Sequence, residues 1–566
     1  MLDWLGVSNL RCFAFLAAIS LAVFLPGFFT LQPMDRDEPR FAQATKQMLE
    51  TGDFVSIRFQ DEARNKKPVG IYWLQAAFVA TGEALGVADA REQIWLYRLP
   101  SLFGAIGAVL ATFWAALAFV PRRSALLAGA LLASTLLLGV EAHLAKTDAV
   151  LCATVVLAMG VLARLYLNRS LKFRHALMFW GAMALGILIK GPIAPIVPLL
   201  AVCVLGFREG SVRWLAPLRP LMGLGIILAV AAPWFVLIAI KTQGAFFSDA
   251  VGGDMLSKVA GGQESHGAPP LTYFALFWVT AWPLAPLVLL ATPAIWAARK
   301  SPAALFLLAW VIPSWIMFEL VPTKLPHYVL PLYPALAILA AKYVSGAAAS
   351  RGGYLPLAAA ILMALVAVVI GGAALLLWAN YFFAFIAAWA ADTEAATGTI
   401  AWLAMALGCG AGVLFAIFSA RALKAQNFEL ATFFGCFAAF SLSVAVYSGV
   451  LTTPAFLVAQ ISPRLAAIED EAAKATTCGE LAPFSTFFRE PSLVFLTETN
   501  LKFGDGGEAA AFLSDSACRI AFVEMRDEPD FLRSLPANLP RDPIQRVRGV
   551  NLGNGKRLDI GVYVRQ

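Results

Sequence analysis

Long apolar segments alternate with short polar ones from near the N-terminus to about residue 452. Each apolar run covers roughly 18 to 25 residues, which is enough to cross a hydrocarbon core of about 30 Å as a helix. The pattern predicts a polytopic α-helical membrane protein with about thirteen transmembrane helices. The expected spans are residues 10–31, 94–120, 124–140, 148–167, 176–189, 191–207, 218–240, 271–297, 302–320, 327–347, 354–378, 397–420 and 428–452. Residues 69–87 are interrupted by Gln75, Thr81 and Glu83, so this segment is expected to lie in the membrane interface.

The composition excludes an ordinary soluble protein. Of the 566 residues, 60% are hydrophobic and only 14% are charged. The formal net charge of +7 does not indicate nucleic-acid binding, because Lys and Arg residues in the loops of a membrane protein orient its helices. The expected partners are therefore membrane lipids and not nucleic acid.

The distribution of Lys and Arg predicts which loops share a side of the membrane. With the N-terminus inside, alternate loops are rich in basic residues, namely Arg122 and Arg123, Arg169, Lys172 and Arg174, Arg208, Arg213 and Arg219, Arg299 and Lys300, Lys342 and Arg351, and Arg421 and Lys424. The opposite loops are poor in cations except for the first, residues 32–93. That loop and residues 241–270 are expected outside, so the cations of the first loop need a purpose other than orientation.

The last 110 or so residues lose the apolar pattern and form a second predicted domain, residues 456–566, after a membrane domain of residues 1–455. Short β-rich runs at 492–497, 519–524 and 557–564, with helical patterns at 463–475 and 508–513, predict a small α/β domain on the outer side. Cys478 and Cys518 both fall in this domain. A disulfide between them and two separate thiols remain equal alternatives.

The first outer loop carries an unusual density of charge. Asp37 and Glu38 follow the first span directly, with Asp35 and Arg40 beside them, and Arg64, Lys66 and Lys67 come a couple of dozen residues later. Carboxylates and cations beside a bilayer indicate chemistry on a lipid phosphate. The alternative is a capped surface helix beginning near Pro39, which accounts for the acids but not for the cations.

Further polar residues gather at other outer loops. They are Glu141, His143, Lys146 and Asp148, then Lys190 of a Lys-Gly-Pro sequence, His266 in a glycine-rich loop, and Lys324, His327 and Tyr328 of Pro-Thr-Lys-Leu-Pro-His-Tyr. Glu141 and His143 are candidate metal ligands that His266, His327 or Asp37 would complete. Tyr72 and Trp73 are expected to be interfacial anchors.

The ensemble of motifs resembles a known family. An Asp-Glu outer loop after the first span, Lys-Pro-x-x-x-x-Trp at 67–73, and the later Lys-Thr-Asp, Lys-Gly-Pro and Pro-Thr-Lys-Leu-Pro-His-Tyr sequences resemble the GT-C glycosyltransferases. Within that superfamily the chain is similar to the bacterial aminoarabinose transferases of lipid A, which are related to the protein O-mannosyltransferases. The resemblance covers roughly residues 10 to 450.

This resemblance implies transfer of 4-amino-4-deoxy-L-arabinose from undecaprenyl phosphate to the phosphate groups of lipid A. The implied place is the periplasmic face of the bacterial inner membrane, and the implied consequence is resistance to polymyxin and other cationic peptides. A polyprenyl-phosphate sugar is already activated, so no nucleotide-binding loop is needed, and the sequence contains no GxxxxGK[ST] element. A divalent metal remains an open alternative, since the family includes metal-assisted and metal-independent members.

The resemblance also implies roles for particular residues. Asp37 is the expected catalytic carboxylate, although Asp35 crowds it, and Asp148 matches a second family acid. Arg40 and Lys67 are the leading candidates for the donor phosphate. The further candidates for the donor phosphate are Arg64, Lys66, Lys324 and Tyr328. The substrate loop is expected to contain His266 and His327.

Two rivals remain open at this stage. One is a GT-C enzyme that moves another sugar, such as a mannosyl group, onto protein or glycan. The other is a lipid or ion transporter, which would favour charged residues inside the spans and paired broken helices.

Overall fold

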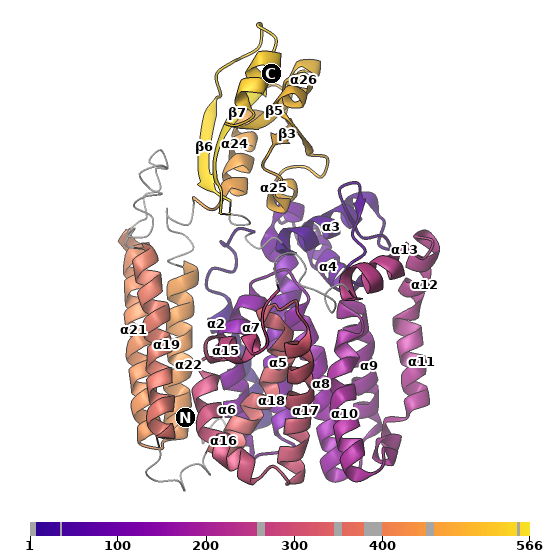
Figure 1. The fold of residues 1–566 in the computed structure, drawn as a ribbon, viewed down its shortest axis with the longest axis vertical. Helices are drawn as coiled ribbons and strands as arrows, with labels where there is room; N and C mark the ends of the chain where they lie inside the picture. Colours follow the sequence, from indigo (N-terminus) through magenta and orange to yellow (C-terminus); the bar gives the residue numbers. More distant parts are fainter. Residues whose placement is uncertain are drawn as a thin grey trace.

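The computed structural model describes residues 7–33, 37–256, 267–344, 354–378, 399–448, 458–551 and 555–566. A bundle of helices forms the larger part, and a smaller domain with a β-sheet stands on one end of it (Figure 1). This arrangement confirms the predicted fold class of an α-helical membrane protein with a C-terminal α/β domain. The expected domain boundary at 455 falls in residues 449–457, outside the described residues.

Two short helices and a two-stranded ribbon form the end of the bundle that faces the smaller domain. They are α3 (Asp37–Thr51), α4 (Gly70–Ala84), β1 (Arg58–Phe59) and β2 (Glu62–Ala63). The other bundle elements are α2 (Asn9–Phe24), η1 (Ala90–Glu92), α5 (Ile94–Ala116), α6 (Arg122–Ala133), α7 (Leu136–Ala142), α8 (Asp148–Asn168), α9 (Phe173–Lys190), α10 (Ile193–Glu209), η2 (Arg213–Leu218), α11 (Pro220–Val230), α12 (Ala232–Lys241), α13 (Ala245–Phe247), η3 (Ser248–Leu256), α15 (Thr272–Thr280), α16 (Leu284–Ala297), α17 (Pro302–Leu320), η4 (Pro326–Leu332), α18 (Tyr333–Tyr343), α19 (Leu355–Trp378), α21 (Thr399–Lys424) and α22 (Phe428–Ser448).

The number of spans differs from the sequence-based expectation. Within the described residues, seven helices are long and apolar enough to cross a membrane, or up to ten if each bent helix pair is one span. Three of the expected spans are sharply bent pairs: α6 with α7 by 62°, α11 with α12 by 43°, and α15 with α16 by 116°. Hydropathy measures apolar length and carries no signal for such bends, so the count of thirteen is not confirmed. The helix α4 has 15 residues, which is short for a span.

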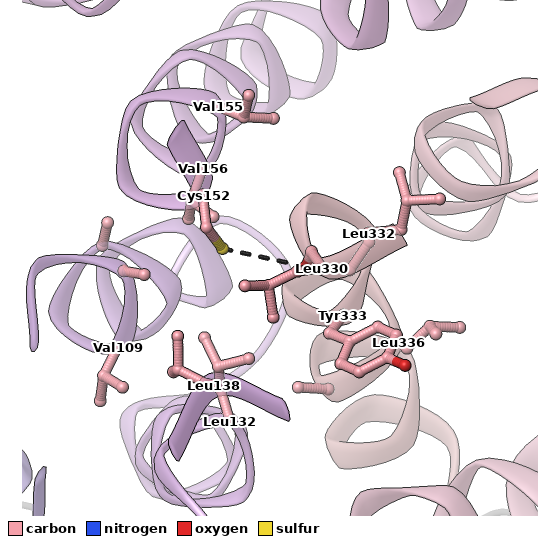
Figure 2. Packing of buried hydrophobic residues seen from close by; sticks show 14 of the residues in the cluster. Val109, Leu132, Leu138, Cys152, Val155, Val156, Leu330, Leu332, Tyr333 and Leu336 are labelled. Carbon is pink, nitrogen blue, oxygen red and sulfur yellow. Dashed lines mark hydrogen bonds between the residues drawn. The ribbon is translucent and has the colours of Figure 1, made fainter. Parts of the chain in front are cut away.

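Apolar packing joins the segments that carry the later sequence motifs. Figure 2 shows Cys152, Val155 and Val156 of α8 facing Leu330, Leu332, Tyr333 and Leu336 of η4 and α18, with Val109, Leu132 and Leu138 completing the cluster. The Cys152 thiol also donates to the carbonyl oxygen of Leu330 over 3.8 Å. This contact holds η4, which contains His327 and Tyr328, against the helix that begins with Asp148.

The C-terminal domain is a five-stranded mixed sheet with helices. Its elements are α24 (Ile461–Ala475), β3 (Ala482–Thr486), α25 (Pro491–Leu496), β4 (Lys502–Gly504), α26 (Gly506–Asp515), β5 (Arg519–Glu524), α27 (Glu528–Ser534), β6 (Gln545–Val550) and β7 (Arg557–Arg565). The strand order is β4-β3-β5-β7-β6, with β3 parallel to both of its neighbours and β7 antiparallel to both of its own. Cys478 and Cys518 form a disulfide, with their Cα atoms 5.5 Å apart.

Most of the local predictions for this domain are confirmed. The strands at 519–524 and 557–564 and the helices at 463–475 and 508–513 correspond to β5, β7, α24 and α26. The β-run at 492–497 is wrong, because these residues form the helix α25. Pro491 occupies the first helical position, where its fixed φ suits a helix, and this signal outweighs the β-propensity of Val494 and Phe495.

A glycine permits the close crossing of α5 and α8. A Cβ atom added at Gly104 would lie 2.7 Å from the backbone nitrogen of Val150 and 2.8 Å from its Cα atom. Backbone atoms cannot rotate away as side chains do, so a larger residue must push the helices apart. The position of Asp148, two residues before Val150, therefore depends on Gly104.

We expect Gly104→Ala to lower the stability of the protein by about 1–3 kcal/mol through overpacking. Thermal unfolding in detergent, followed by tryptophan fluorescence, measures the effect. The matched control is Gly181→Ala in α9, because a Cβ atom at Gly181 would meet no atom within 4 Å. Equal unfolding temperatures for the two variants would contradict the packing argument.

Candidate active site

The acidic pair of the first outer loop lies at the start of a helix. Asp37 and Glu38 occupy the first turn of α3, followed by Pro39. Carboxylates are favoured there by the unpaired backbone N–H groups and the positive end of the helix dipole. Successive residues on a helix point about 100° apart, so the two acids face different surroundings.

Asp37 is the acid that faces the solvent. Its side chain is 42% exposed, and one carboxylate oxygen lies 3.9 Å from the guanidinium groups of both Arg40 and Arg64. Arg64 is itself held by the ring of Phe41, with the guanidinium carbon 5.1 Å from the ring centre. An accessible carboxylate thus lies between two cations that are suited to bidentate phosphate contacts.

Tyr72 lies beneath this group and is not the predicted interfacial anchor. It is fully buried, and its ring packs against Phe41 at 5.4 Å. Burial raises the pKa of its hydroxyl, and the neighbouring Arg64 opposes that shift. The neighbouring Trp73 is partly exposed and donates to the carbonyl oxygen of Phe54 over 2.8 Å.

Glu38 has a structural role. Glu38 and Arg98 are both fully buried, and the guanidinium group of Arg98 donates to the two carboxylate oxygens over 2.7 and 2.9 Å. Arg98 also donates to the carbonyl oxygens of Leu31 and Gln32, at 2.6 and 3.3 Å. A bidentate pair of this kind fixes α3 to α5 and to the chain that leads into α3.

The same glutamate connects α3 to the turn between α7 and α8. The backbone N–H of Ala145 donates to Glu38 over 2.9 Å, and the carbonyl oxygen of Ala145 accepts from Gln75 of α4 over 3.1 Å. Gln75 in turn accepts from Thr45 over 2.7 Å. Asp37 and Asp148, which lie on separate elements, are therefore linked through Glu38, the next residue after Asp37, and Ala145, three residues before Asp148.

A second polar cluster forms where α8 begins. Asp148, the first residue of α8, is buried and paired with Lys190. His327 lies between two acids, with Nε2 3.8 Å from Asp148 and Nδ1 3.4 Å from Glu141. Glu141 is also 3.8 Å from the ammonium group of Lys146. The cluster draws together residues from four separate motifs.

Local sequence explains how these side chains converge. In Lys-Gly-Pro, Gly191 has a φ of 61°, which ends α9 immediately after Lys190 and turns the chain into α10. The ammonium group of Lys190 then lies 5.3 Å from the ring centre of Tyr328. Pro326 begins the 3₁₀ helix η4, and this helix places His327 and Tyr328 beside Lys190.

The cluster bears on the question of a metal. One ligand atom each from Glu141, Asp148 and His327 lie within 4.8 Å of one another, and a second oxygen of Glu141 is buried without a hydrogen-bond partner. However, Lys190 and Lys146 already balance the two carboxylates. A divalent cation would have to displace an ammonium group, so this donor set favours an ion-pair network over a resident metal.

His143 does not join Glu141 as the sequence suggested. Its two ring nitrogens lie 2.7 Å from the carbonyl oxygen of Gly139 and 2.9 Å from that of Pro26. Its ring stacks on Tyr447 with centroids 3.9 Å apart. Two residues of separation on a helix place side chains on different faces, so His327 takes the place expected for His143.

The other predicted residues are distributed around these two groups. Lys66 is exposed and Lys67 half-buried in the turn between β2 and α4, the turn that also contains Arg64. Lys324 donates to the carbonyl oxygens of Val321 and Ala268 over 2.7 and 3.1 Å, and so closes the turn before η4. His266 lies outside the described residues.

Sequence reasoning missed Arg98 and Lys46. A signal existed for Arg98, since a lone arginine in an apolar span near its outer end usually has a buried partner. Lys46, in the middle of α3, carries no comparable signal, because its partners belong to the C-terminal domain.

Comparison with known proteins bears on the fold of the chain. Residues 37–243 match the family model described as dolichyl-phosphate-mannose-protein mannosyltransferase. The chain superposes on ArnT from Cupriavidus metallidurans bound to undecaprenyl phosphate, with 17% identity, 97% of each chain covered and a TM-score of 0.71. The apo form of that protein gives 18% identity, the same coverage and a TM-score of 0.68. The chain therefore has the GT-C glycosyltransferase fold, as its motifs predicted.

Within this class the similarity is to particular transferases. The undecaprenyl phosphate-alpha-4-amino-4-deoxy-L-arabinose arabinosyl transferase of Pectobacterium carotovorum subsp. carotovorum (strain PC1) is 28% identical over 354 residues, which are 61% of this chain and 60% of that protein. The protein of the same name from Pseudomonas aeruginosa (strain LESB58) is 28% identical over 336 residues, 56% of this chain and 58% of that protein. The matches thus span somewhat under two thirds of these relatives.

We expect Arg98→Met to destabilise the protein by about 3–5 kcal/mol, because it leaves the buried Glu38 without its cation. The double variant Arg98→Met with Glu38→Gln should recover part of the loss. The control is Arg91→Met, which removes an exposed ion pair with Glu83 and should cost less than about 1 kcal/mol. Chemical unfolding in detergent compares the four proteins, and a small loss in Arg98→Met would contradict the structural role.

Proposed function

We propose that this chain is an integral-membrane glycosyltransferase that moves 4-amino-4-deoxy-L-arabinose from undecaprenyl phosphate to lipid A phosphate groups. The reaction takes place at the periplasmic face of the bacterial inner membrane. The observation that carries the proposal is the exposed carboxylate of Asp37, held between the guanidinium groups of Arg40 and Arg64. The similarity to transferases named for this donor supports the choice of sugar.

The chemistry requires both signs of charge at one place. The bond between the anomeric carbon and the carrier phosphate oxygen breaks, and the electron pair leaves with the phosphate. A new bond then forms between that carbon and an oxygen of the acceptor phosphate. Positive charge develops on the sugar and negative charge on the leaving group, so a carboxylate suits the first and cations suit the second.

Asp37 acts on the sugar in this proposal. A lipid A phosphate is ionised near neutral pH, so it needs little deprotonation, and Asp37 positions the donor and stabilises the developing positive charge. With a hydroxyl acceptor, the same carboxylate would be the general base. Arg40, Arg64 and Lys67 neutralise the phosphate of the leaving carrier.

The cluster around Asp148 supports this surface from below. Its carboxylate is buried and paired with Lys190, so it positions α8, α9 and η4 relative to one another. Tyr328 is half-exposed and borders Lys190 and His327. In this proposal it is the residue of the cluster that contacts the donor. Lys66 and Lys324 are assigned smaller parts in the same electrostatic surface.

A second candidate is transfer of another sugar, such as a mannosyl group, from a polyprenyl phosphate to protein or glycan. The match of residues 37–243 to the protein mannosyltransferase model favours it. The acceptor separates the two candidates, because lipid A gains the mass of aminoarabinose in the first and remains unmodified in the second.

Mass spectrometry of lipid A from cells with and without the protein tests the proposal directly. We expect the aminoarabinose mass to be present with the wild type, together with resistance to polymyxin, and absent with Asp37→Asn. In an assay of the purified protein this variant should lose at least about a hundredfold in turnover, because it removes a preorganised charge from the reacting centre. Asp61→Asn, an exposed acid between β1 and β2, is the matched control. Modified lipid A in Asp37→Asn cells would exclude the assignment.

We expect Lys67→Ala to raise the KM for the undecaprenyl phosphate-linked donor roughly tenfold or more, as loss of a charged phosphate contact predicts. Its kcat should change much less. Lys474→Ala, an exposed lysine in α24, serves as the control. An unchanged dependence on donor concentration would remove Lys67 from the phosphate site.

A further inference from the structure

We propose that Lys46 is a positioning residue that couples the C-terminal domain to α3, and so fixes the place of Asp37. The test combines an activity measurement, which rests on the proposed function, with a structural measurement, which does not. The two domains meet where α25 lies against α3 (Figure 1).

An aromatic side chain anchors the C-terminal domain in the bundle. Phe495, near the end of α25, is fully buried and packs edge-on against Tyr97 with ring centres 5.2 Å apart. The residues of the apolar cluster that receives it are Ala42, Val79, Ala90, Ile94, Leu96, Tyr97 and Ala145. Ala145 is the residue whose N–H donates to Glu38. The anchor therefore reaches the framework that holds the acidic pair.

Lys46 binds the end of the helix that carries this anchor. Its ammonium group is buried and donates to the carbonyl oxygens of Phe495 and Thr497 over 3.2 and 3.3 Å. It also lies 3.6 Å from Glu92 of η1. The last carbonyls of a helix lack partners within the helix, and a cation is favoured at that negative end. One side chain of α3 thus satisfies the C-terminus of a helix from the other domain.

The contacts to the C-terminal domain occupy one face of α3. Gln43 donates to the Thr499 hydroxyl over 2.7 Å, and that hydroxyl donates to Glu50 over 2.8 Å. Lys46 lies nine residues after Asp37, which is about half a turn around the helix axis. One face of α3 therefore docks the domain while the opposite face presents Asp37, so displacement of the domain moves the carboxylate.

Acidic residues surround this contact and make it sensitive to pH. Glu469 of α24 is 8% exposed, and one of its oxygens has no hydrogen-bond partner. Burial is the main cause that raises its pKa to about 8, and the charges of Glu498, Asp470 and Glu92 raise it further, against the attraction of Lys46. Burial also raises the pKa of Glu92 and Glu498. The other acids that bear on these two groups are Asp89, Asp470, Glu480 and Glu50.

The direction of the pH effect follows from these shifts. The docked domain keeps a proton on Glu469 that a free carboxyl would release at its ordinary pKa of 4.5. Docking is therefore unaffected at lower pH, weakens progressively as the pH rises from about 4.5 to about 8, and is constant above that range.

Hydrogen exchange of residues 37–51 in the full-length protein, read by mass spectrometry, measures the coupling. We expect Lys46→Met to speed exchange of these amides about tenfold or more and to lower the kcat for sugar transfer by a similar factor, with the donor KM within about twofold of the wild type. Lys46→Arg, which retains a charged donor, should recover most of both. Lys474→Met is the matched control. A purely structural role would instead reduce the yield of folded protein and leave the kcat of the folded fraction unchanged.

The pH arm uses Glu469→Gln. After correction for intrinsic exchange, protection of the amides of residues 37–51 in the wild type should fall between about pH 5 and about pH 8. The Glu469→Gln variant should show no change in protection over this range. Wild-type protection in Lys46→Met, or an unaltered profile in Glu469→Gln, would overturn the proposal. If the wild type transfers no aminoarabinose, the proposed function fails while the exchange measurements still decide the coupling.

Discussion

The buried ion pair between Glu38 and Arg98 is the interaction on which the outer end of the bundle depends. A carboxylate and a guanidinium group without solvent are stable only when nearly all of their hydrogen-bonding capacity is satisfied. Here Arg98 also bonds to the chain before α3, and Glu38 also bonds to the turn before α8. The hydrogen bonds that stabilise the pair therefore also fix the positions of Asp37 and Asp148. The outer end of the bundle is therefore ordered by electrostatics, while apolar packing holds the helices below it.

Asp37 and Glu38 are adjacent acids with different surroundings and different roles. Asp37 is exposed and lies between cations, whereas Glu38 is buried and holds the framework. At the second cluster Asp148 is buried like Glu38 and is neutralised by Lys190, and the ring of Tyr328 borders this pair. Residue type alone does not separate such roles, because the rotation between adjacent helical positions decides which side chain meets solvent.

The sequence sufficed for the features that depend on local pattern. Apolar run length predicted the membrane class, and short runs rich in β-forming residues predicted β5 and β7 of the C-terminal domain. The loop assignment predicted that Asp148, Lys190 and His327 lie at outer loops, and the structure brings the three together. The partner of Arg98, the contact of His143 with Pro26 and the burial of Tyr72 depend on residues remote in sequence, and no local pattern encodes them. The pairing of Glu141 with His143 is the site prediction that changed for this reason.

The position of Phe495 in the bundle has a consequence for folding during synthesis. The cluster that receives this ring is lined by residues between 42 and 145, which are synthesised several hundred residues before Phe495. Until the C-terminal domain arrives, the early helices enclose a site that lacks an aromatic ring, and α25 is not yet there to accept from Lys46. The order of translation thus delays completion of the outer surface until α25 has been synthesised, so a chain that ends before α25 lacks this support.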